Sequence, residues 1–141
     1  MKIRFLSILL AFLTMFVMAG LFNGLVVNEL VSENIDSAML REAPNLGLIA
    51  FGYALLALLM TLIYPRVVSP ASYSVRSGFL FGMVAGIFWL LPQALVMHGI
   101  YRFPSMDLLI DPAWALLEQG IAGAIIGLIY AKFSKPDNSS F

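Results

Sequence analysis

FLSILLAFLTMFVMAGLFNGLVV, residues 5–27, decides the fold, because no charged residue interrupts the chain between Arg4 and Glu29. A helix needs about 20 apolar residues to cross the roughly 30 Å of hydrocarbon in a bilayer, and this stretch is long enough. It lacks the period-two alternation of hydrophobic residues that marks a barrel strand. The stretch therefore predicts a membrane-spanning helix.

Three later stretches have the same character. They cover approximately residues 46–64, 78–97 and 113–130, and the last follows Asp111-Pro112, a pair typical of a helix start. Of all 141 residues, 61% are hydrophobic and 11% are charged, too few polar side chains to cover a water-soluble core. Because every backbone amide in lipid needs a partner within the chain, helices are expected. We predict an all-α membrane protein whose residues 1–141 form one transmembrane domain, a four-transmembrane-helix bundle.

The chain offers little of the chemistry by which enzymes are recognised. It contains no cysteine, which excludes disulfides and thiolate metal sites, and it has a single histidine. No phosphate-binding loop, serine-hydrolase motif or zinc-protease motif occurs. Eight basic and eight acidic residues balance, without a basic cluster that would bind nucleic acid. We expect no catalytic residue, metal, cofactor or nucleic-acid partner, although an enzyme that acts on lipid or quinone remains open.

Basic residues divide unequally between the two sides of the predicted bundle. Only Arg41 and Arg102 fall on one side, and the others fall on the side of the termini: Lys2, Arg4, Arg66, Arg76, Lys132 and Lys135. Because loops rich in lysine and arginine stay in the cytoplasm, both termini are predicted to be cytoplasmic.

The first stretch has a second interpretation. Lys2 and Arg4 precede an apolar run that includes Val17-Met18-Ala19, a pattern that also fits a cleavable signal peptide. Hydrophobicity continues beyond that point to Val27, so we expect the first helix to be retained. A mature chain that starts at Gly20 would overturn the prediction of four spans.

Small residues recur at intervals of four in every predicted span. This spacing places them on one helical face, where a neighbouring backbone can approach closely. The glycines expected to mediate helix packing are Gly20, Gly24, Gly78, Gly82, Gly86, Gly123 and Gly127. Packing within the bundle is the first expectation, and a dimer face is the alternative.

A duplicated hairpin is a further hypothesis. Met18-Ala19-Gly20-Leu21-Phe22 is similar to Val84-Ala85-Gly86-Ile87-Phe88, and the spacing from Pro44 to Gly52 matches that from Pro112 to Gly120. The second half of the bundle would then repeat the first about an axis along the membrane normal. Chance similarity between apolar helices explains the same pattern.

Glu118 is the one acidic residue well inside a predicted span. An ionised carboxylate in a bilayer is costly, and such residues often mark functional sites. Pro92 removes a backbone hydrogen bond and should kink its helix. Other polar residues fall toward the same, outer half of the membrane: Gln93, His98, Gln119, Asn23 and Asn28. We predict an outward-opening polar pocket in which these residues accompany Glu118 and bind a ligand or a proton.

The alternative is a structural role for the same residues. Glu118 could be neutralised by a proton or paired with His98, Arg41 or Arg102, and Gln93 could form an interhelical hydrogen bond. A structural tie should be dry and fully hydrogen-bonded, whereas a transport site should be wet. The sequence leaves both interpretations open.

Glycines, aromatic residues and the glutamate form a broader pattern. Its elements are Pro44, Gly47 to Gly52-Tyr53, Ile63-Tyr64-Pro65, Gly78 to Gly86, Leu95-Val96 before Gly99, Trp114 to Glu118, and Gly123 to Tyr130. In these residues the chain resembles small uncharacterised bacterial four-helix integral membrane proteins, a resemblance that covers most of the chain and implies no activity. Small multidrug transporters share its size, but their essential glutamate lies in the first helix, where this chain has none.

These observations favour a non-catalytic accessory or binding subunit that packs through its glycine faces. The alternative is an oligomeric small-molecule or ion transporter or channel in which Glu118 binds a proton or cation. The expected partners are membrane lipid and either further copies of the chain or a larger membrane complex.

Overall fold

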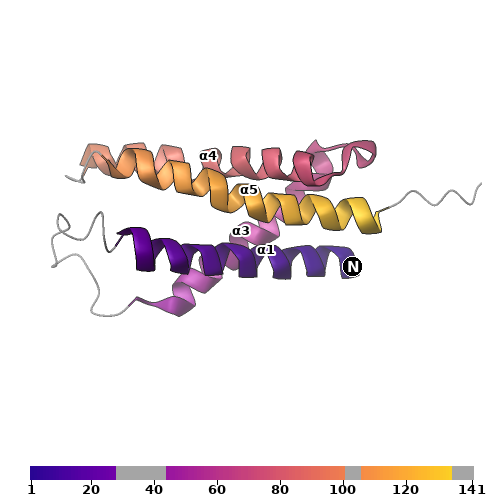
Figure 1. The fold of residues 1–141 in the computed structure, drawn as a ribbon, viewed down its shortest axis with the longest axis horizontal. Coiled ribbons are helices and arrows are strands. Elements are labelled where there is room, and N and C mark those ends of the chain that lie inside the picture. Colours follow the sequence, from indigo (N-terminus) through magenta and orange to yellow (C-terminus); the bar gives the residue numbers. More distant parts are fainter. Residues whose placement is uncertain (28–43, 101–105, 135–141) are drawn as a thin grey trace, which may run out of the picture.

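The computed structural model describes residues 1–27, 44–100 and 106–134, and nearly all of them are helical. The long helices are α1 (Lys2–Leu21), α3 (Leu46–Val67), α4 (Val75–Ile100) and α5 (Asp107–Phe133). A π-helical segment, η1 (Phe22–Val27), continues α1, and a short 3-10 helix, η4 (Pro70–Ser72), lies between α3 and α4. The start of α1 and the end of α5 lie at the same end of the bundle (Figure 1), which we call the termini end, opposite the far end.

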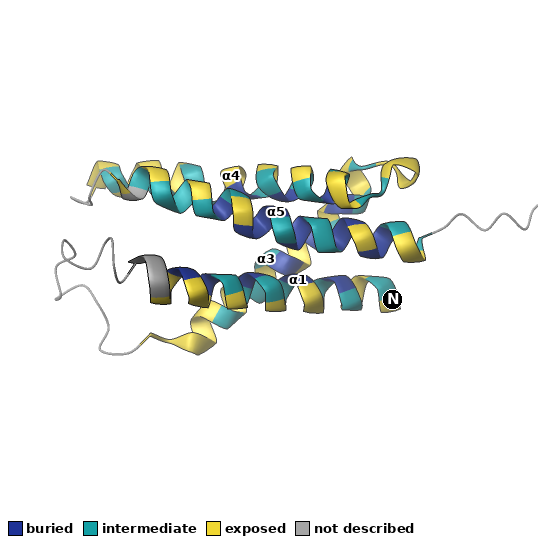
Figure 2. Ribbon diagram, in the orientation of Figure 1, coloured by how far each residue is buried: buried dark blue, intermediate teal, exposed yellow. Residues whose placement is uncertain are grey.

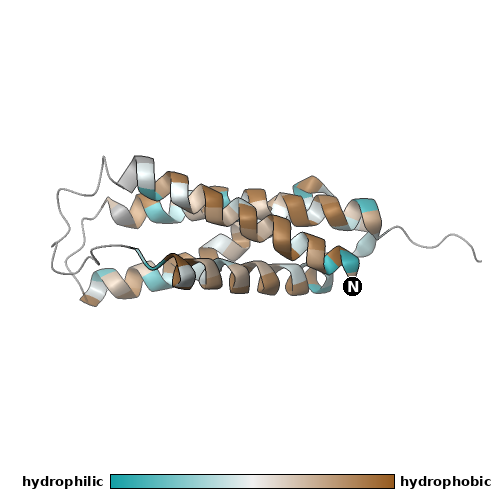
Figure 3. Cartoon of the chain, turned by 90° about the horizontal axis from the view of Figure 1, so that it is seen from below, coloured by the Kyte–Doolittle hydropathy of each residue, from teal (hydrophilic) through white to brown (hydrophobic). Residues whose placement is uncertain are grey.

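All four helices are long and apolar enough to cross a membrane. Figure 3 shows hydrophobic residues along the middle of the helices and hydrophilic ones mainly toward their ends. The prediction of an all-α chain with four apolar helices is confirmed for the part of the chain that the structure describes. Their length and composition indicate an integral membrane protein.

The start of α5 differs from the prediction. The helix begins at Asp107 rather than near residue 113, so Asp111 and Pro112 lie inside it instead of at its start. Its first turn closes upstream of the proline, where two amides bond the Met106 carbonyl oxygen at 3.0 Å. Because Pro112 lacks only one donor and sits near the helix start, it removes a single bond and does not end the helix.

A reciprocal cap starts α4 at Val75. The Ser77 amide donates to the Ser74 hydroxyl oxygen at 3.1 Å, and the Ser74 amide donates to the Ser77 hydroxyl oxygen at 3.0 Å. This arrangement has the form of a capping box with serine in place of glutamate. The cap explains why α4 begins before the predicted start, and the helix then continues through Pro92.

Helix α5 forms the centre of the bundle. It packs against α4 and α1, and buried residues follow most of its length in Figure 2. Facing it, α1 buries one residue every four positions along a single face: Ser7, Ala11, Met15 and Ala19. Large hydrophobic side chains on the outside of all four helices are exposed, as on a surface that lipid covers.

Glycines bring the backbones of α4 and α5 into direct contact. A Cβ added to Gly78 would lie 2.8 Å from the Gly127 Cα, and one added to Gly123 would lie 2.8 Å from the Gly82 Cα. Cβ atoms do not approach neighbouring atoms so closely, so only glycine fits these positions. The two helices run antiparallel in this register, with Gly86 opposite Ala115 and Gln119.

The glycines of α1 and η1 lie in a different environment. Gly20 is exposed, and a Cβ added there or at Gly24 would meet nothing within 4 Å. Within the described residues, Gly20 therefore has no close backbone contact of the kind found between α4 and α5. Gly20 was matched to Gly86 in the repeat hypothesis, yet Gly86 is buried, so the two hairpins do not pack alike at this position.

Helix α3 is inclined to the other helices and is held mainly by its second half (Figure 1). Its buried residues are Ala57, Met60, Thr61 and Tyr64. The ring of Tyr64 packs edge-on against Tyr130 of α5, with centroids 5.5 Å apart, and the Tyr130 hydroxyl donates to the Thr61 carbonyl oxygen at 3.1 Å. These contacts fix α3 to α5 near the termini end.

Candidate functional site

Glu118 lies near the middle of α5 and is buried. Its exposed fraction is 2%, as is that of the neighbouring Gln119. At 1.5 Å per residue, the carboxylate-bearing residue lies roughly 16 Å from the start of α5 at Asp107. An acidic side chain therefore lies deep within a helix of membrane-spanning length, as the sequence predicts.

Two N–H donors bond the Glu118 carboxylate. The Trp114 indole nitrogen donates to Oε2 at 3.1 Å, and the Gln119 amide nitrogen donates to Oε1 at 3.1 Å. The side chain of Tyr53, on α3, lies near enough to interact electrostatically with the carboxylate. Within residues 1–27, 44–100 and 106–134, no basic side chain forms an ion pair with Glu118.

The indole that reaches Glu118 is itself held by stacking. Trp114 and Phe22 are stacked with ring centroids 4.8 Å apart and planes 17° from parallel. Phe22 is the first residue of η1, so the change from α-helix to π-helix occurs where α1 meets α5. This contact fixes the direction of the indole N–H.

Gln119 lies between Glu118 and helix α4. A Cβ added to Gly86 would lie 2.8 Å from the Gln119 Oε1 atom, so the glycine leaves room for this side chain. The same oxygen is buried and has no hydrogen-bond partner in the described part of the chain. The amide nitrogen of Gln119, in contrast, donates a hydrogen bond to Glu118.

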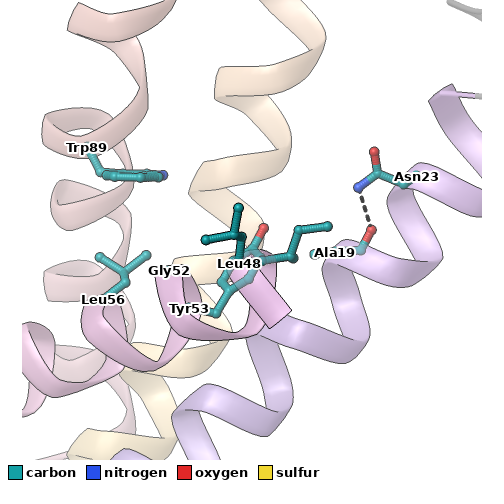
Figure 4. Close-up of a pocket in the computed structure, with 8 residues that line it drawn as sticks. Ala19, Asn23, Leu48, Gly52, Tyr53, Leu56 and Trp89 are labelled. Atoms are coloured by element: carbon teal, nitrogen blue, oxygen red, sulfur yellow. Dashed lines mark hydrogen bonds between the residues drawn. The ribbon is translucent and has the colours of Figure 1, made fainter. Parts of the chain in front are cut away.

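A cavity of about 330 Å³ opens between α1, α3 and α4, toward the far end. In Figure 4, Trp89 and Leu56 lie on one side of it, Asn23 lies on the other, and Tyr53 lies between them. The complete lining is Ala19, Asn23, Leu48, Ile49, Gly52, Tyr53, Leu56 and Trp89. Tyr53 joins the two parts of the site, because it lines the cavity and also reaches Glu118.

The predicted polar residues do not form one cluster. Continuing the α4–α5 register places Glu118 level with Ala85, so Gln93 lies roughly 12 Å and His98 roughly 20 Å farther along α4. Gln93 is exposed, and His98 Nδ1 pairs with the Ala94 carbonyl oxygen at 2.9 Å. These two side chains share the far half of the bundle with Glu118 but lie at other levels, which is why neither contributes to its hydrogen bonds.

Asn23 is the predicted residue that does line the cavity. Its amide nitrogen donates to the Ala19 carbonyl oxygen at 2.8 Å. Asn28 lies outside the described residues, as do Arg41 and Arg102, the two arginines considered as partners of Glu118.

Sequence reasoning missed the two aromatic residues beside Glu118. Trp114 precedes Glu118 by four residues, a spacing that places both on one helical face, so the helical period could have identified it. Tyr53 comes from another helix, and nothing in its own surroundings in the sequence marks it. The place of Trp89 in the cavity wall was not predicted either.

A second polar cluster lies at the termini end. The Tyr64 hydroxyl and the Ser77 hydroxyl lie 2.9 Å apart, and Tyr73 packs against both Tyr64 and Tyr130. Burial raises the pKa of Tyr73 above its ordinary value, and the nearby Tyr130 and Tyr64 hydroxyls raise it further. Tyr73 therefore stays neutral at physiological pH, which suits a structural contact.

No protein-family model, no curated protein and no solved structure matches this chain. No group of three or more acidic or histidine side chains suited to a metal ion occurs among the residues that the structure describes. A functional argument therefore depends on the cavity and on the carboxylate beside it.

Proposed function

We propose that this protein is a non-catalytic binding subunit of a bacterial inner membrane, with both termini in the cytoplasm, and that it holds a small amphipathic molecule in the cavity beside Tyr53. The single observation that carries the proposal is this cavity of about 330 Å³, whose wall includes Tyr53, a tyrosine that lies beside a buried glutamate. Ligand sites in proteins have this character: mostly apolar walls with a few polar groups that orient the ligand.

The position of the cavity supports entry from the bilayer or from the outer side. Ala19 is one of its lining residues, and it lies about 26 Å along the helix from Lys2 at the termini end. If the termini are cytoplasmic, the cavity lies in the outer half of the membrane. The cavity is lined by residues of three helices of membrane-spanning length, so an amphipathic molecule dissolved in lipid could reach it from the bilayer.

The hydrogen bonding of Glu118 supports a positioning role rather than catalysis. A general acid or base must reach the reacting group of a substrate. Glu118 does not line the cavity, and both of its carboxylate oxygens already accept hydrogen bonds. It therefore suits the task of fixing Tyr53 and setting the electrostatic potential beside the ligand.

A matched pair of glycine variants tests the binding proposal. Gly52→Phe places a ring in the cavity, because Gly52 lines it and has open space around its missing side chain. Gly20→Phe is the control, since Gly20 is equally open but does not line the cavity. The probe is neopentylbenzene, followed in detergent micelles by the indole N–H resonance of Trp89. We expect a saturable shift in the wild type and in Gly20→Phe, and none in Gly52→Phe; equal binding by both variants contradicts the proposal, as does a wild type that binds neither this probe nor its cationic isostere benzyltrimethylammonium.

Proton-coupled transport is the second candidate, and the position of Tyr53 beside Glu118 favours it. The Trp114 indole and the Gln119 amide nitrogen can only donate, whereas the Tyr53 hydroxyl can either donate or accept. Tyr53 is therefore the neighbour that could respond to protonation of Glu118, and the change would reach the cavity wall. Glu118→Gln should abolish proton-coupled flux in liposomes if the protein is a transporter, and should affect only stability and ligand preference if it is a binding subunit.

A further inference from the structure

The walls of the cavity carry no formal charge of their own. Its lining residues are apolar except for Asn23, Tyr53 and Trp89. Glu118 lies one side chain behind Tyr53, so its carboxylate is the acidic group that acts on the cavity through that tyrosine. Neutral donors stabilise a carboxylate but do not cancel its charge, and no ion pair of Glu118 occurs in the described part of the chain.

The hydrogen bonds of Glu118 match its ionised form. An ionised carboxylate only accepts hydrogen bonds. Trp114 and Gln119 present N–H groups to different oxygens of the carboxylate, and the Tyr53 side chain lies near it. Both hydrogen bonds are satisfied at once when the carboxylate is negatively charged, so this arrangement of donors suits an anion, and no cationic partner of Glu118 occurs among the described residues.

We infer that the ligand of the cavity is an organic cation, a substituted ammonium ion whose apolar groups contact Leu48, Ile49 and Leu56 while its charge lies near Tyr53. This inference rests on the proposed binding function and specifies the chemical class of the ligand. Two aromatic rings in the wall, those of Trp89 and Tyr53, offer faces that attract a cation. The uncharged, weakly polar lining lowers screening, so the field of Glu118 extends into the cavity.

The expected preference is large enough to measure. Two unit charges about 8 Å apart, at an effective dielectric constant of about 20, attract each other enough to give a preference of roughly 30-fold over a neutral molecule of the same shape. An anion of similar shape should be disfavoured by a comparable factor, because the same field repels it. The aromatic rings add to the preference for the cation.

Three probes of similar shape test this order: benzyltrimethylammonium, its neutral isostere neopentylbenzene, and the anion phenylmethanesulfonate. Binding is measured in nonionic micelles from the indole resonances of Trp89 and Trp114, with each dissociation constant corrected for partition into detergent. We expect the cation to bind at least tenfold more tightly than the neutral probe, and the anion to bind most weakly. A neutral probe that binds as tightly as the cation overturns the inference while it leaves the binding function standing.

The outcome in which no probe binds saturably contradicts the binding function itself, so the two failures are distinguishable. Glu118→Gln provides the second test, because it keeps an oxygen and an N–H at this position but removes the charge. The ratio of cation to neutral affinity should fall below threefold in this variant. A ratio that stays at wild-type size shows that Glu118 is not the source of selectivity. If the variant does not fold, the order of the three probes on the wild type decides alone.

Discussion

Trp114 and Glu118 lie one turn apart on α5, and the indole N–H of the first donates to Oε2 of the second at 3.1 Å. The bond links residues four positions apart, the spacing at which side chains on one helical face meet. Its partner oxygen is buried in a helix of membrane-spanning length, where water cannot replace the lost donor.

Replacing Trp114 with Phe should therefore destabilise the protein by about 1–3 kcal/mol, because a buried carboxylate oxygen loses its donor. Phe keeps a ring to stack on Phe22, so the loss reflects the hydrogen bond more than packing. The free energy of unfolding in mixed micelles, measured for the wild type, Trp114→Phe, Glu118→Leu and the double variant, gives the coupling between the two residues, because leucine offers no acceptor to the indole. A coupling energy near zero would show that the contact contributes nothing.

Replacing Gly82 with Ala should separate α4 from α5. A Cβ added to Gly82 would lie against the Gln119 carbonyl group and 3.0 Å from the Gly120 Cα, and backbone atoms cannot move aside as a flexible side chain can. We expect a loss of about 1–3 kcal/mol in thermal unfolding. Gly20→Ala is the matched control, because the same methyl group meets nothing within 4 Å there. Equal effects of the two substitutions would contradict the close packing of α4 on α5.

Replacing Tyr130 with Phe removes one bond between α5 and α3. The lost hydroxyl donates to the Thr61 carbonyl oxygen at 3.1 Å, and a typical hydrogen bond of this kind contributes about 0.5–1.5 kcal/mol. Tyr73→Phe is the comparison, since its ring packs in the same cluster but no hydrogen bond of its hydroxyl occurs within the described residues. Chemical unfolding should rank Tyr130→Phe as the less stable variant. The reverse order would mean that ring packing, not this bond, holds α3.

Single cysteines test the proposed orientation without background, because the natural chain has none. Ser134→Cys lies at the termini end, just after α5, and Met106→Cys lies at the far end, just before it. In intact spheroplasts a membrane-impermeant maleimide should label Met106→Cys, and it should label Ser134→Cys only after permeabilisation. The opposite pattern would place the termini outside and the cavity in the inner half of the membrane.

The four helices could be predicted because a bilayer requires long apolar segments, and residues 5–27 satisfy this requirement without reference to any other part of the chain. The start of α5 could not, because Pro112 tolerates a position inside the helix as well as at its first turn. A local rule cannot distinguish these two positions when the upstream residues also form a helix.

Packing and the site depend on pairs of helices, and here the sequence is less informative. Gly82 of α4 lies against the backbone of α5, and Gly123 of α5 lies against the backbone of α4, because a row of glycines on one helix faces a row on the other. Gly20 also belongs to a pair of glycines four residues apart, but no neighbouring backbone lies close to it among the described residues. The spacing of glycines within one helix therefore could not show which glycines contact another helix. Glu118 was predicted from its isolation in an apolar segment, but Tyr53 could be found only once α3 was placed beside α5.

The uneven attachment of α3 has a consequence for the proposed binding function. Every buried residue of this helix lies in its second half, between Ala57 and Tyr64, whereas its first half supplies most of the cavity wall. Because α3 is fixed only through its second half, it can tilt with little loss of contact. We therefore expect a bulkier ligand to displace the first half of α3 instead of being excluded. The proposed site should therefore discriminate only weakly between ligands of different size, because the less tightly packed half of α3 forms most of its wall.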